Sequence, residues 1–406
     1  MTHKSPHSQN RRIAVIGAGP AGLMAAEVIA REGGEAVAVT VFERMPSPAR
    51  KLLMAGRGGL NITHSEAMER FRARYGAAEG WMLTALDAFP PQALVQWCED
   101  LGQPTFVGSS GRVFPRAMKA SPLLRAWLTR LNDLGVTLKT RAEWSGWTDD
   151  GLLRFADGST YAADAIVLAL GGASWPRLGA DGGWTALLPD IAITPLQPAN
   201  CGFHVAWSAH FRSRHAGSPL KRIALNFAGQ TIRGEAMITD QGIEGGAVYA
   251  LSARLRDAVL RDGVAELKID LRPDMDDAEL HDKLNQPRRG ASLANFLRKQ
   301  INLSPVAIGL VQEALHGGST APLDRLVRAL LLRLTAPFGL ARAISTAGGI
   351  ALDEMDEHLM LHKRPGVFVA GEMLDWEAPT GGYLLQGCLA TGVAAGRGVL
   401  HWLQGH

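Results

Sequence analysis

The stretch RRIAVIGAGPAGLMAAEVIAREGGEAVAVTVFER, residues 11–44, decides the fold class. An apolar run with β-branched residues, 12–17, ends on glycine, which is typical of a buried parallel strand. Good helix formers follow over 22–31 and stop at the glycine pair 33–34. A second strand is predicted over 36–42. Strand, glycine turn, helix and strand make a βαβ unit, so the sequence predicts an α/β protein with a Rossmann-like domain.

The glycines of the first turn match the dinucleotide-binding fingerprint G-x-G-x-x-G. Gly17 would allow the tight turn, and Gly19 would let the backbone approach a pyrophosphate. Gly22 would allow the helix to pack closely on the strand, and Glu43 ends the second strand where a carboxylate can accept hydrogen bonds from ribose hydroxyls. The fingerprint does not distinguish FAD from NAD, so this motif leaves both cofactors open.

Two C-terminal segments favour FAD. FAD proteins of the glutathione-reductase type use their far C-terminal part to hold the ribityl chain and the isoalloxazine ring. Here Gly371 and Glu372 follow a predicted strand, a geometry that suits a carboxylate facing a ribityl hydroxyl. The segment 380–383 opens the final helix, whose N-terminal amides could face the pyrimidine edge of a flavin. We therefore predict FAD as the cofactor.

Two further glycine-rich segments are predicted near that cofactor. Residues 51–63, KLLMAGRGGLNIT, show neither a helical nor a strand period and are interpreted as a loop. In this loop the backbone and Arg57 would approach a phosphate or the flavin, although an ordinary surface loop would also account for the glycines. Gly171 and Gly172 end a buried strand predicted over 165–170, which suits a linker that passes close to the cofactor.

The length of the chain and the changes in its sequence pattern predict several domains. The 406 residues exceed the roughly 100–200 of one domain, and glycine, with 46 residues, is about 11% against roughly 7% in average usage. We expect an FAD-binding domain over 1–190 and 340–406. An inserted strand-rich, β-barrel-like domain is expected over 191–273 with about 335–345. A helical insertion is expected over 274–334.

The formal net charge of +3 is too small to argue for nucleic acid by itself. Arginines do cluster around 44–57 and 112–119. The three cysteines lie far apart in the sequence and match neither a zinc site nor a C-x-x-C pair, which suits a reducing compartment. The first twelve residues lack a signal-peptide core, and no apolar run approaches 18 residues. We expect a cytoplasmic protein without a metal centre or a membrane span.

Motifs spread in order along the chain resemble the BaiN-like and aminoacetone-oxidase-like flavoprotein family. Besides the fingerprint with Glu43, they are the segments 51–63, 111–121, 171–176, 346–349 and 365–386. The resemblance implies an FAD domain interrupted by a β-barrel-like domain with a helical insertion. The activities it implies include reduction of conjugated double bonds, oxidation of an aminoketone and reduction of uridine in ribosomal RNA. The motifs and the resemblance together predict these cofactor-binding residues: Gly17, Gly19, Pro20, Ala21, Gly22, Glu43, Arg44, Lys51, Arg57, Gly58, Asn61, Gly171, Gly172, Gly371, Glu372, Asp375, Gly381, Gly382, Tyr383 and Leu384.

The chain also departs from that family's pattern. Where the family reads glycine-arginine-cysteine-asparagine, this sequence has Gly58-Gly59-Leu60-Asn61, so the arginine and the cysteine are both missing. A threonine-histidine-x-glycine pattern appears as Thr239-Asp240-Gln241-Gly242, and Leu384 replaces the usual asparagine after Gly-Gly-Tyr. These differences identify a divergent member.

Three functions stay open at this stage. The first is an FAD-dependent reductase, dehydrogenase or oxidase of a small molecule, and the second is a flavin-dependent RNA pyrimidine reductase. The third is a flavoprotein that carries electrons without turnover of its own. No C-x-x-C follows the fingerprint, which excludes a dithiol relay, and no second fingerprint exists for NADH or NADPH, so such a donor would bind elsewhere or transiently. Asp240 and Glu244 are the predicted catalytic acid/base residues, because the resemblance brings their loop near the flavin, and His204, Tyr383 and Asp375 are weaker candidates.

Overall fold

The computed structural model describes residues 10–55 and 58–405. The chain divides into two compact units, unit 1 (Met1–Gln197 with Ser345–His406) and unit 2 (Pro198–Ile344). The junctions lie a few residues beyond the domain boundaries expected at 190 and 340. The strand-rich and helical segments between them belong to one unit with one hydrophobic core.

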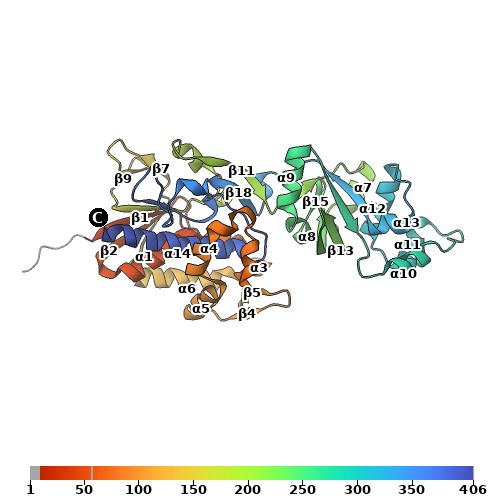
Figure 1. Ribbon diagram of the computed structural model, residues 1–406, viewed down its shortest axis with the longest axis horizontal. Coiled ribbons are helices and arrows are strands. Elements are labelled where there is room, and N and C mark those ends of the chain that lie inside the picture. The colour runs from red at the N-terminus through yellow and green to blue at the C-terminus, as the bar shows by residue number, and fades with distance from the viewer. Residues whose placement is uncertain (1–9, 56–57, 406) are drawn as a thin grey trace, which may run out of the picture. The chain divides into compact units, whose positions relative to one another are not determined.

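A five-stranded parallel sheet forms the centre of unit 1 (Figure 1). The central strand pairs with its neighbours in the registers Ile13↔Val39 and Ile13↔Ala165, and its side chains from Ile13 to Val15 are fully buried. The next strand in sequence pairs with one edge of this central strand, and a strand from residues 165–168 pairs with its other edge. A crevice for a ligand is expected at the carboxyl end of a strand where the strand order changes direction in this way. In spatial order the strands are β19 (Val367–Val369), β10 (Ala165–Leu168), β1 (Arg11–Ile16), β2 (Val37–Glu43) and β6 (Thr137–Thr140).

Two helices from opposite ends of the chain pack side by side on this sheet, α1 (Pro20–Gly33) and α14 (Tyr383–Gln404) (Figure 1). Two glycines of α14 allow the close approach. A Cβ on Gly392 would lie 2.5 Å from the carbonyl oxygen of Ala21, and one on Gly396 would lie 3.0 Å from that of Ala25. The C-terminal segment therefore completes the domain that the N-terminal segment begins.

The segment after β2 differs from its expected form. Residues Arg50–Ala55, predicted as the start of a loop, form the short helix α2. These six residues are good helix formers, but the segment is too short to display a helical period. The loop that follows contains Gly59 at φ +106°, where a Cβ would lie 2.8 Å from Cε of Met118. This backbone suits glycine and disfavours the arginine of the family pattern.

Smaller sheets and helices surround the parallel sheet of unit 1. The antiparallel sheets are β3 (Thr63–His64), β5 (Arg112–Pro115) and β4 (Thr105–Val107), and then β7 (Trp144–Trp147), β8 (Leu153–Phe155) and β9 (Thr160–Tyr161). Strand β11 (Ile193–Ala199) pairs with β18 (Ser345–Ile350), at the segments that lead out of and back into the unit. The remaining helices are α3 (Met68–Ala73), α4 (Glu79–Ala88), α5 (Pro91–Asp100) and α6 (Ala120–Asp133).

Unit 2 is built on a six-stranded antiparallel sheet that closes into a barrel-like ring, as predicted. The amide of His204 donates to the carbonyl of Ala336 (2.9 Å), and Phe203 pairs with Pro337, which joins the first strand to the chain just after the last. In spatial order the strands are β12 (Phe203–His204), β15 (Gly242–Glu244), β14 (Gln230–Ile238), β13 (Pro219–Phe227), β16 (Ala265–Asp270) and β17 (Leu330–Leu334). The helices are α7 (Ala209–His215), α8 (Gly246–Tyr249), α9 (Ser252–Asp262), α10 (Asp277–Leu284), α11 (Leu293–Ile301), α12 (Pro305–His316) and α13 (Leu323–Arg328).

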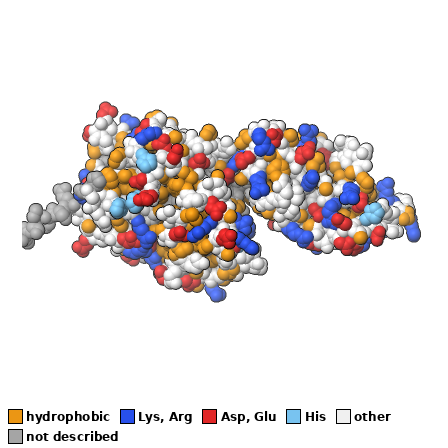
Figure 2. Space-filling view, in the orientation of Figure 1, with side chains coloured by type: hydrophobic (Ala, Val, Ile, Leu, Met, Phe, Trp, Pro, Cys, Tyr) orange, Lys and Arg blue, Asp and Glu red, His pale blue; other side chains and the backbone are white. Residues whose placement is uncertain are grey.

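The surface carries acidic and basic side chains intermixed on the visible face of each unit, in keeping with the small net charge (Figure 2). Within residues 10–55 and 58–405, no helix is both long and apolar enough to cross a membrane.

Candidate cofactor site

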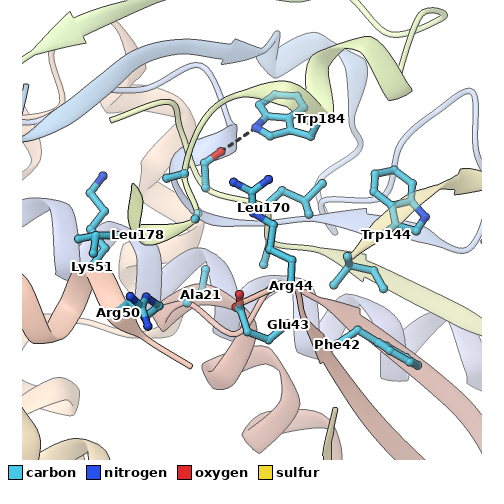
Figure 3. Close-up of a pocket in the computed structure, with 18 of the residues that line it drawn as sticks. Ala21, Phe42, Glu43, Arg44, Arg50, Lys51, Trp144, Leu170, Leu178 and Trp184 are labelled. Atoms are coloured by element: carbon cyan, nitrogen blue, oxygen red, sulfur yellow. Dashed lines mark hydrogen bonds between the residues drawn. The ribbon is translucent and has the colours of Figure 1, made fainter. Parts of the chain in front are cut away.

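A cavity of about 500 Å³ opens in unit 1 at the carboxyl ends of β1, β2 and β10 (Figure 3). Its volume lies within the usual range of small-molecule and cofactor sites. Half of the predicted cofactor-binding residues line it: Gly17, Gly19, Pro20, Ala21, Glu43, Arg44, Lys51, Gly171, Gly371 and Glu372. Arg57 lies outside the described residues.

The three fingerprint glycines have distinct roles in the turn from β1 to α1. Gly17 has φ +102°, and its Cβ would lie 2.3 Å from the carbonyl oxygen of Ala169. A Cβ on Gly22 would lie 2.0 Å from the carbonyl oxygen of Gly17, so both glycines are required by packing. Gly19 differs, because no atom lies within 4 Å of its Cβ position although it lines the cavity. This open space beside the N-terminus of α1 suits a phosphate group.

Glu43 is oriented by the backbone at the end of β2. Its Oε2 accepts a hydrogen bond from the amide of Ala18 (2.9 Å), and its Oε1 accepts one from the amide of Met45 (2.8 Å). Each carboxylate oxygen can accept a further hydrogen bond. The carboxylate is therefore held rigidly at the cavity wall and can still receive ribose hydroxyls.

Lys51 and Glu372, which both line the cavity, form an ion pair. The Nζ of Lys51 donates to both carboxylate oxygens of Glu372 (2.9 and 2.6 Å) and to Oγ of Ser174 (2.6 Å). The amide of Thr346 also donates to Glu372 (3.0 Å). The Oγ1 of Thr346 accepts hydrogen bonds from the amides of Ala173 and Ser174 (2.8 and 3.1 Å). These hydrogen bonds fix the segment that follows β10, residues 171–174, against strand β18.

Cys388 lies in the second turn of α14 and lines the cavity beside this ion pair. Burial raises the pKa of its thiol to about 12, and the neighbouring Glu372 carboxylate acts in the same direction. Because the thiolate is the reactive form, Cys388 is an inert, apolar part of the wall at neutral pH.

The N-terminus of α14 is anchored by a polar cluster. Gly382 has φ +95°, and its Cβ would lie 2.5 Å from Cα of Thr63. The backbone just before α14 therefore lies directly against the backbone of β3. The hydroxyl of Tyr383 donates to the Glu66 carboxylate (2.5 Å), which also accepts two hydrogen bonds from Arg74. Burial raises the pKa of Tyr383, and the hydrogen bond to Glu66 raises it further. Tyr383 therefore holds the helix start in place and keeps its proton.

The cavity wall contains polar atoms that lack hydrogen-bond partners among the described residues. They include the buried Nε atoms of Arg44 and Arg50 and Nε1 of Trp144, and Oδ1 of Asn61 is a fourth such atom in the adjacent loop. An unpaired buried polar group costs about 1–3 kcal/mol, so such atoms usually face a ligand or water. The residues present thus fit a large polar cofactor such as a dinucleotide.

The model of the family described as "HI0933-like protein Rossmann domain" matches residues 11–398. The chain belongs to this family. HI0933-like proteins are FAD-dependent flavoproteins of the oxidoreductase class, which agrees with the cofactor predicted from the sequence.

Curated relatives of this HI0933-like protein match over nearly their full length. A 3-dehydro-bile acid delta(4,6)-reductase of Clostridium scindens is 26% identical over 95% of this chain and 98% of its own. A ribosomal RNA dihydrouridine synthase of Escherichia coli is 24% identical over 92% of this chain and 94% of its own. Among solved structures, a 3-ketosteroid delta1-dehydrogenase from Sterolibacterium denitrificans covers 98% of this chain and all of its own, with a TM-score of 0.52 and 14% identity. That structural similarity concerns the fold alone.

Several predicted residues of this HI0933-like protein lie outside the cavity wall. Gly22 lies in the first turn of α1 and Tyr383 begins α14, while Gly58, Asn61, Gly172, Gly381 and Gly382 lie in the connecting segments. Asp375 accepts a hydrogen bond from the hydroxyl of Thr194 (2.6 Å), and Leu384 is half-buried in the first turn of α14.

The two predicted acid/base residues lie in unit 2. Asp240 is exposed in the turn between β14 and β15, and Glu244 is half-buried in β15, 3.6 Å from Nη2 of Arg342. Their catalytic role stays a prediction.

The described residues of this HI0933-like protein do not include a group of three or more His, Cys, Asp or Glu side chains arranged to hold a metal ion.

Sequence reasoning missed several residues that shape the site. Ser174 and Thr346 hold the Lys51–Glu372 pair, and Asp181 and Trp184 line the cavity from a segment without motif or period. Ser174 follows the predicted linker at Gly171 and Gly172 and could have been inferred from it. No local signal marks Asp181.

Proposed function

We propose that this protein is an FAD-dependent reductase that saturates a carbon–carbon double bond conjugated to a carbonyl in a small organic substrate. The observation that carries the proposal is the combination of a fitting dinucleotide cavity with two full-length relatives whose names both describe double-bond reduction. When bound, FAD supplies hydride transfer from N5 of its reduced isoalloxazine ring.

The chain's own residues would bind and orient the cofactor. Gly19 and the N-terminus of α1 would receive the pyrophosphate, and Glu43 would accept ribose hydroxyls. The Lys51–Glu372 pair would hold the middle of the cofactor. The N-terminal amides of α14, which begins at Tyr383, carry partial positive charge and would stabilise electron density on a flavin held at this end.

The proposed reaction needs two electrons and two protons. One hydride equivalent reaches one carbon of the double bond, and one proton reaches the other. An external two-electron donor of the nicotinamide class, NADH or NADPH, would restore the reduced cofactor and leave as the oxidised nucleotide. We assign the proton delivery to Asp240, in the turn between β14 and β15, or to Glu244, at the end of β15.

Anaerobic mixing tests this function. The purified holoprotein is reduced with dithionite or NADPH and mixed with a 3-oxo steroid that carries a conjugated double bond, while the visible absorbance of oxidised flavin is followed. We expect reoxidation by the unsaturated ketone and none by the saturated ketone, which serves as the control. Reoxidation by oxygen alone would identify an oxidase. Reoxidation by other redox proteins alone would identify an electron carrier.

A second candidate, an RNA pyrimidine reductase, is favoured by one surface. Residues 101–132 contain five arginines and lysines and no acidic residue. Phe106 stacks on Phe114 with 5.7 Å between ring centroids and is 37% exposed. Cations interspersed with an exposed aromatic ring are typical of surfaces that bind single-stranded nucleic acid. The exposed cations of this segment are Arg112, Arg116, Lys119 and Arg125.

This second function is tested by binding of a uridine-rich single-stranded RNA measured by fluorescence anisotropy. We expect affinity that falls with salt and weakens in an Arg112→Ala/Arg116→Ala variant, while a charge-matched Arg212→Ala/Arg214→Ala variant in unit 2 keeps it. Equal weakening in both variants, or no binding at low salt, would leave the small-molecule reductase as the function.

A further inference from the structure

One segment of unit 1, residues 175–187, contributes to the cavity wall and is here called the strap. It consists of two short 3-10 turns, Pro176–Leu178 and Gly183–Leu187. Five of its residues between 178 and 183 line the cavity, as does Trp184. The Nε1 of Trp184 donates to the carbonyl of Gly171 (2.9 Å) (Figure 3). This hydrogen bond connects one end of the strap to the segment that follows β10.

Arg44 ties the middle of the strap to the end of β2. Its Nη2 lies 2.9 Å from Oδ2 of Asp181 in the strap, and its Nη1 lies 3.8 Å from Oε1 of Glu143. The side chain extends from beside Glu43 toward Leu170, and thus along the cavity (Figure 3). Its Nε is buried and has no hydrogen-bond partner among the described residues. The guanidinium therefore joins the strap and Glu143 to the end of β2.

The electrostatics of Asp181 support a persistent ion pair. Burial opposes ionisation, but the hydrogen bond from Arg44 and the amide of Gly183 lower the pKa of Asp181 below its ordinary value. The carboxylate is consequently charged at neutral pH. The Arg44 side chain is 28% exposed and the Asp181 side chain 44%, so the pair is only partly shielded from solvent and remains accessible to salt.

The strap also fits closely against the chain beneath it. Gly179 has φ +107°, and a Cβ there would lie 2.8 Å from Cγ of Met45. Opening this part of the strap requires separating Gly179 from Met45 and Asp181 from Arg44. Arg44 and Met45 are consecutive in sequence, and Gly179 and Asp181 are two residues apart.

We propose that Arg44 is a positioning residue that clasps the strap, through Asp181, over the adenosine end of bound FAD and thereby slows release of the cofactor. The adenosine end is assigned because Arg44 directly follows Glu43, the carboxylate placed for the ribose. The proposal rests on FAD binding but not on the identity of the substrate. Loss of the ion pair should leave the cavity formed while the strap opens more often.

The test measures FAD release from the holoprotein. An excess of an unrelated apoflavoprotein traps the released FAD, and the trapped fraction is followed with time. Arg44→Met and Asp181→Asn should each accelerate release about fivefold, and the double variant should be no faster than either single variant, because both remove the same contact. The matched control, Asp190→Asn, breaks an ion pair with Arg364 (2.7 Å) away from the cavity and should release FAD at the wild-type rate.

Salt provides an independent measurement, which begins with the wild-type protein. Release from the wild type should accelerate as sodium chloride is raised, and this dependence should be reduced in Asp181→Asn. Acceleration by Arg44→Met with an unchanged rate in Asp181→Asn would overturn the clasp and indicate that Arg44 acts on FAD alone. Unchanged release in both variants would also overturn it. A colourless protein that takes up no FAD would instead defeat the proposed function.

Discussion

Lys51 and Glu372 lie 321 residues apart in sequence, yet the Lys51 ammonium donates to both oxygens of the Glu372 carboxylate. One residue comes from the helix after β2 and the other follows β19, at the far edge of the parallel sheet. The pair joins the N-terminal and C-terminal parts of unit 1 at the cavity that fits FAD.

Breaking that pair should weaken cofactor binding. In Lys51→Met the Glu372 carboxylate would remain largely buried with the Thr346 amide as its main donor, and its charge would repel the cofactor's phosphates. We expect FAD affinity to fall about tenfold, or about 1.4 kcal/mol, measured by calorimetric titration of the apoprotein. Glu372→Gln in the same background should recover part of the loss. Wild-type affinity in Lys51→Met would show that the pair has no role in binding.

The fingerprint glycines provide a matched pair of variants. Gly22→Ala puts a methyl group 2.0 Å from a carbonyl oxygen and should lower the thermal unfolding temperature of the apoprotein by several degrees. Gly19→Ala has open space and should leave that temperature nearly unchanged while lowering FAD affinity. Equal destabilisation by both substitutions would contradict the separation of the packing role from the binding role.

Glu27, in the middle of α1, is fully buried and should contribute strongly to stability. Its Oε2 accepts hydrogen bonds from the indoles of Trp97 (3.1 Å) and Trp127 (2.7 Å), and its Oε1 accepts one from Arg130 (3.2 Å). Glu27→Ala leaves three donors without an acceptor, so we expect the free energy of unfolding to fall by about 3 kcal/mol. Urea denaturation followed by tryptophan fluorescence measures it, with the exposed Glu32→Ala as the control. A loss no larger than that of the control would refute the buried network.

Acid should release the anchor of α14. Burial opposes the shift, but hydrogen bonds from Arg74 and Tyr383 lower the pKa of Glu66 below its ordinary 4.5. Because the folded-state pKa is depressed, the stabilisation is complete well above pH 4.5 and is lost as the pH falls through the lowered value. The stability difference between wild type and Glu66→Gln should therefore be constant near neutral pH and shrink below pH 4.5. Thermal unfolding at a series of pH values measures this difference, and a difference independent of pH would contradict the role of the ionised carboxylate.

The sequence by itself determined the βαβ unit, the glycine fingerprint with Glu43, the C-terminal glycine segment and hence the FAD-binding fold. These features are local in sequence: the spacing of apolar residues indicates which faces are buried, and the fingerprint glycines directly follow the strand that ends at them.

Tertiary structure decided how the site is assembled. The pairing of Lys51 with Glu372, the hydrogen bond between Tyr383 and Glu66 and the approach of Asp181 to Arg44 all join segments distant in sequence. Such pairings depend on the order of strands in the sheet and on the packing of loops against it, because a charged side chain leaves no periodic trace of its partner. The local pattern therefore predicted the cofactor, while the three-dimensional packing decided which side chains hold it.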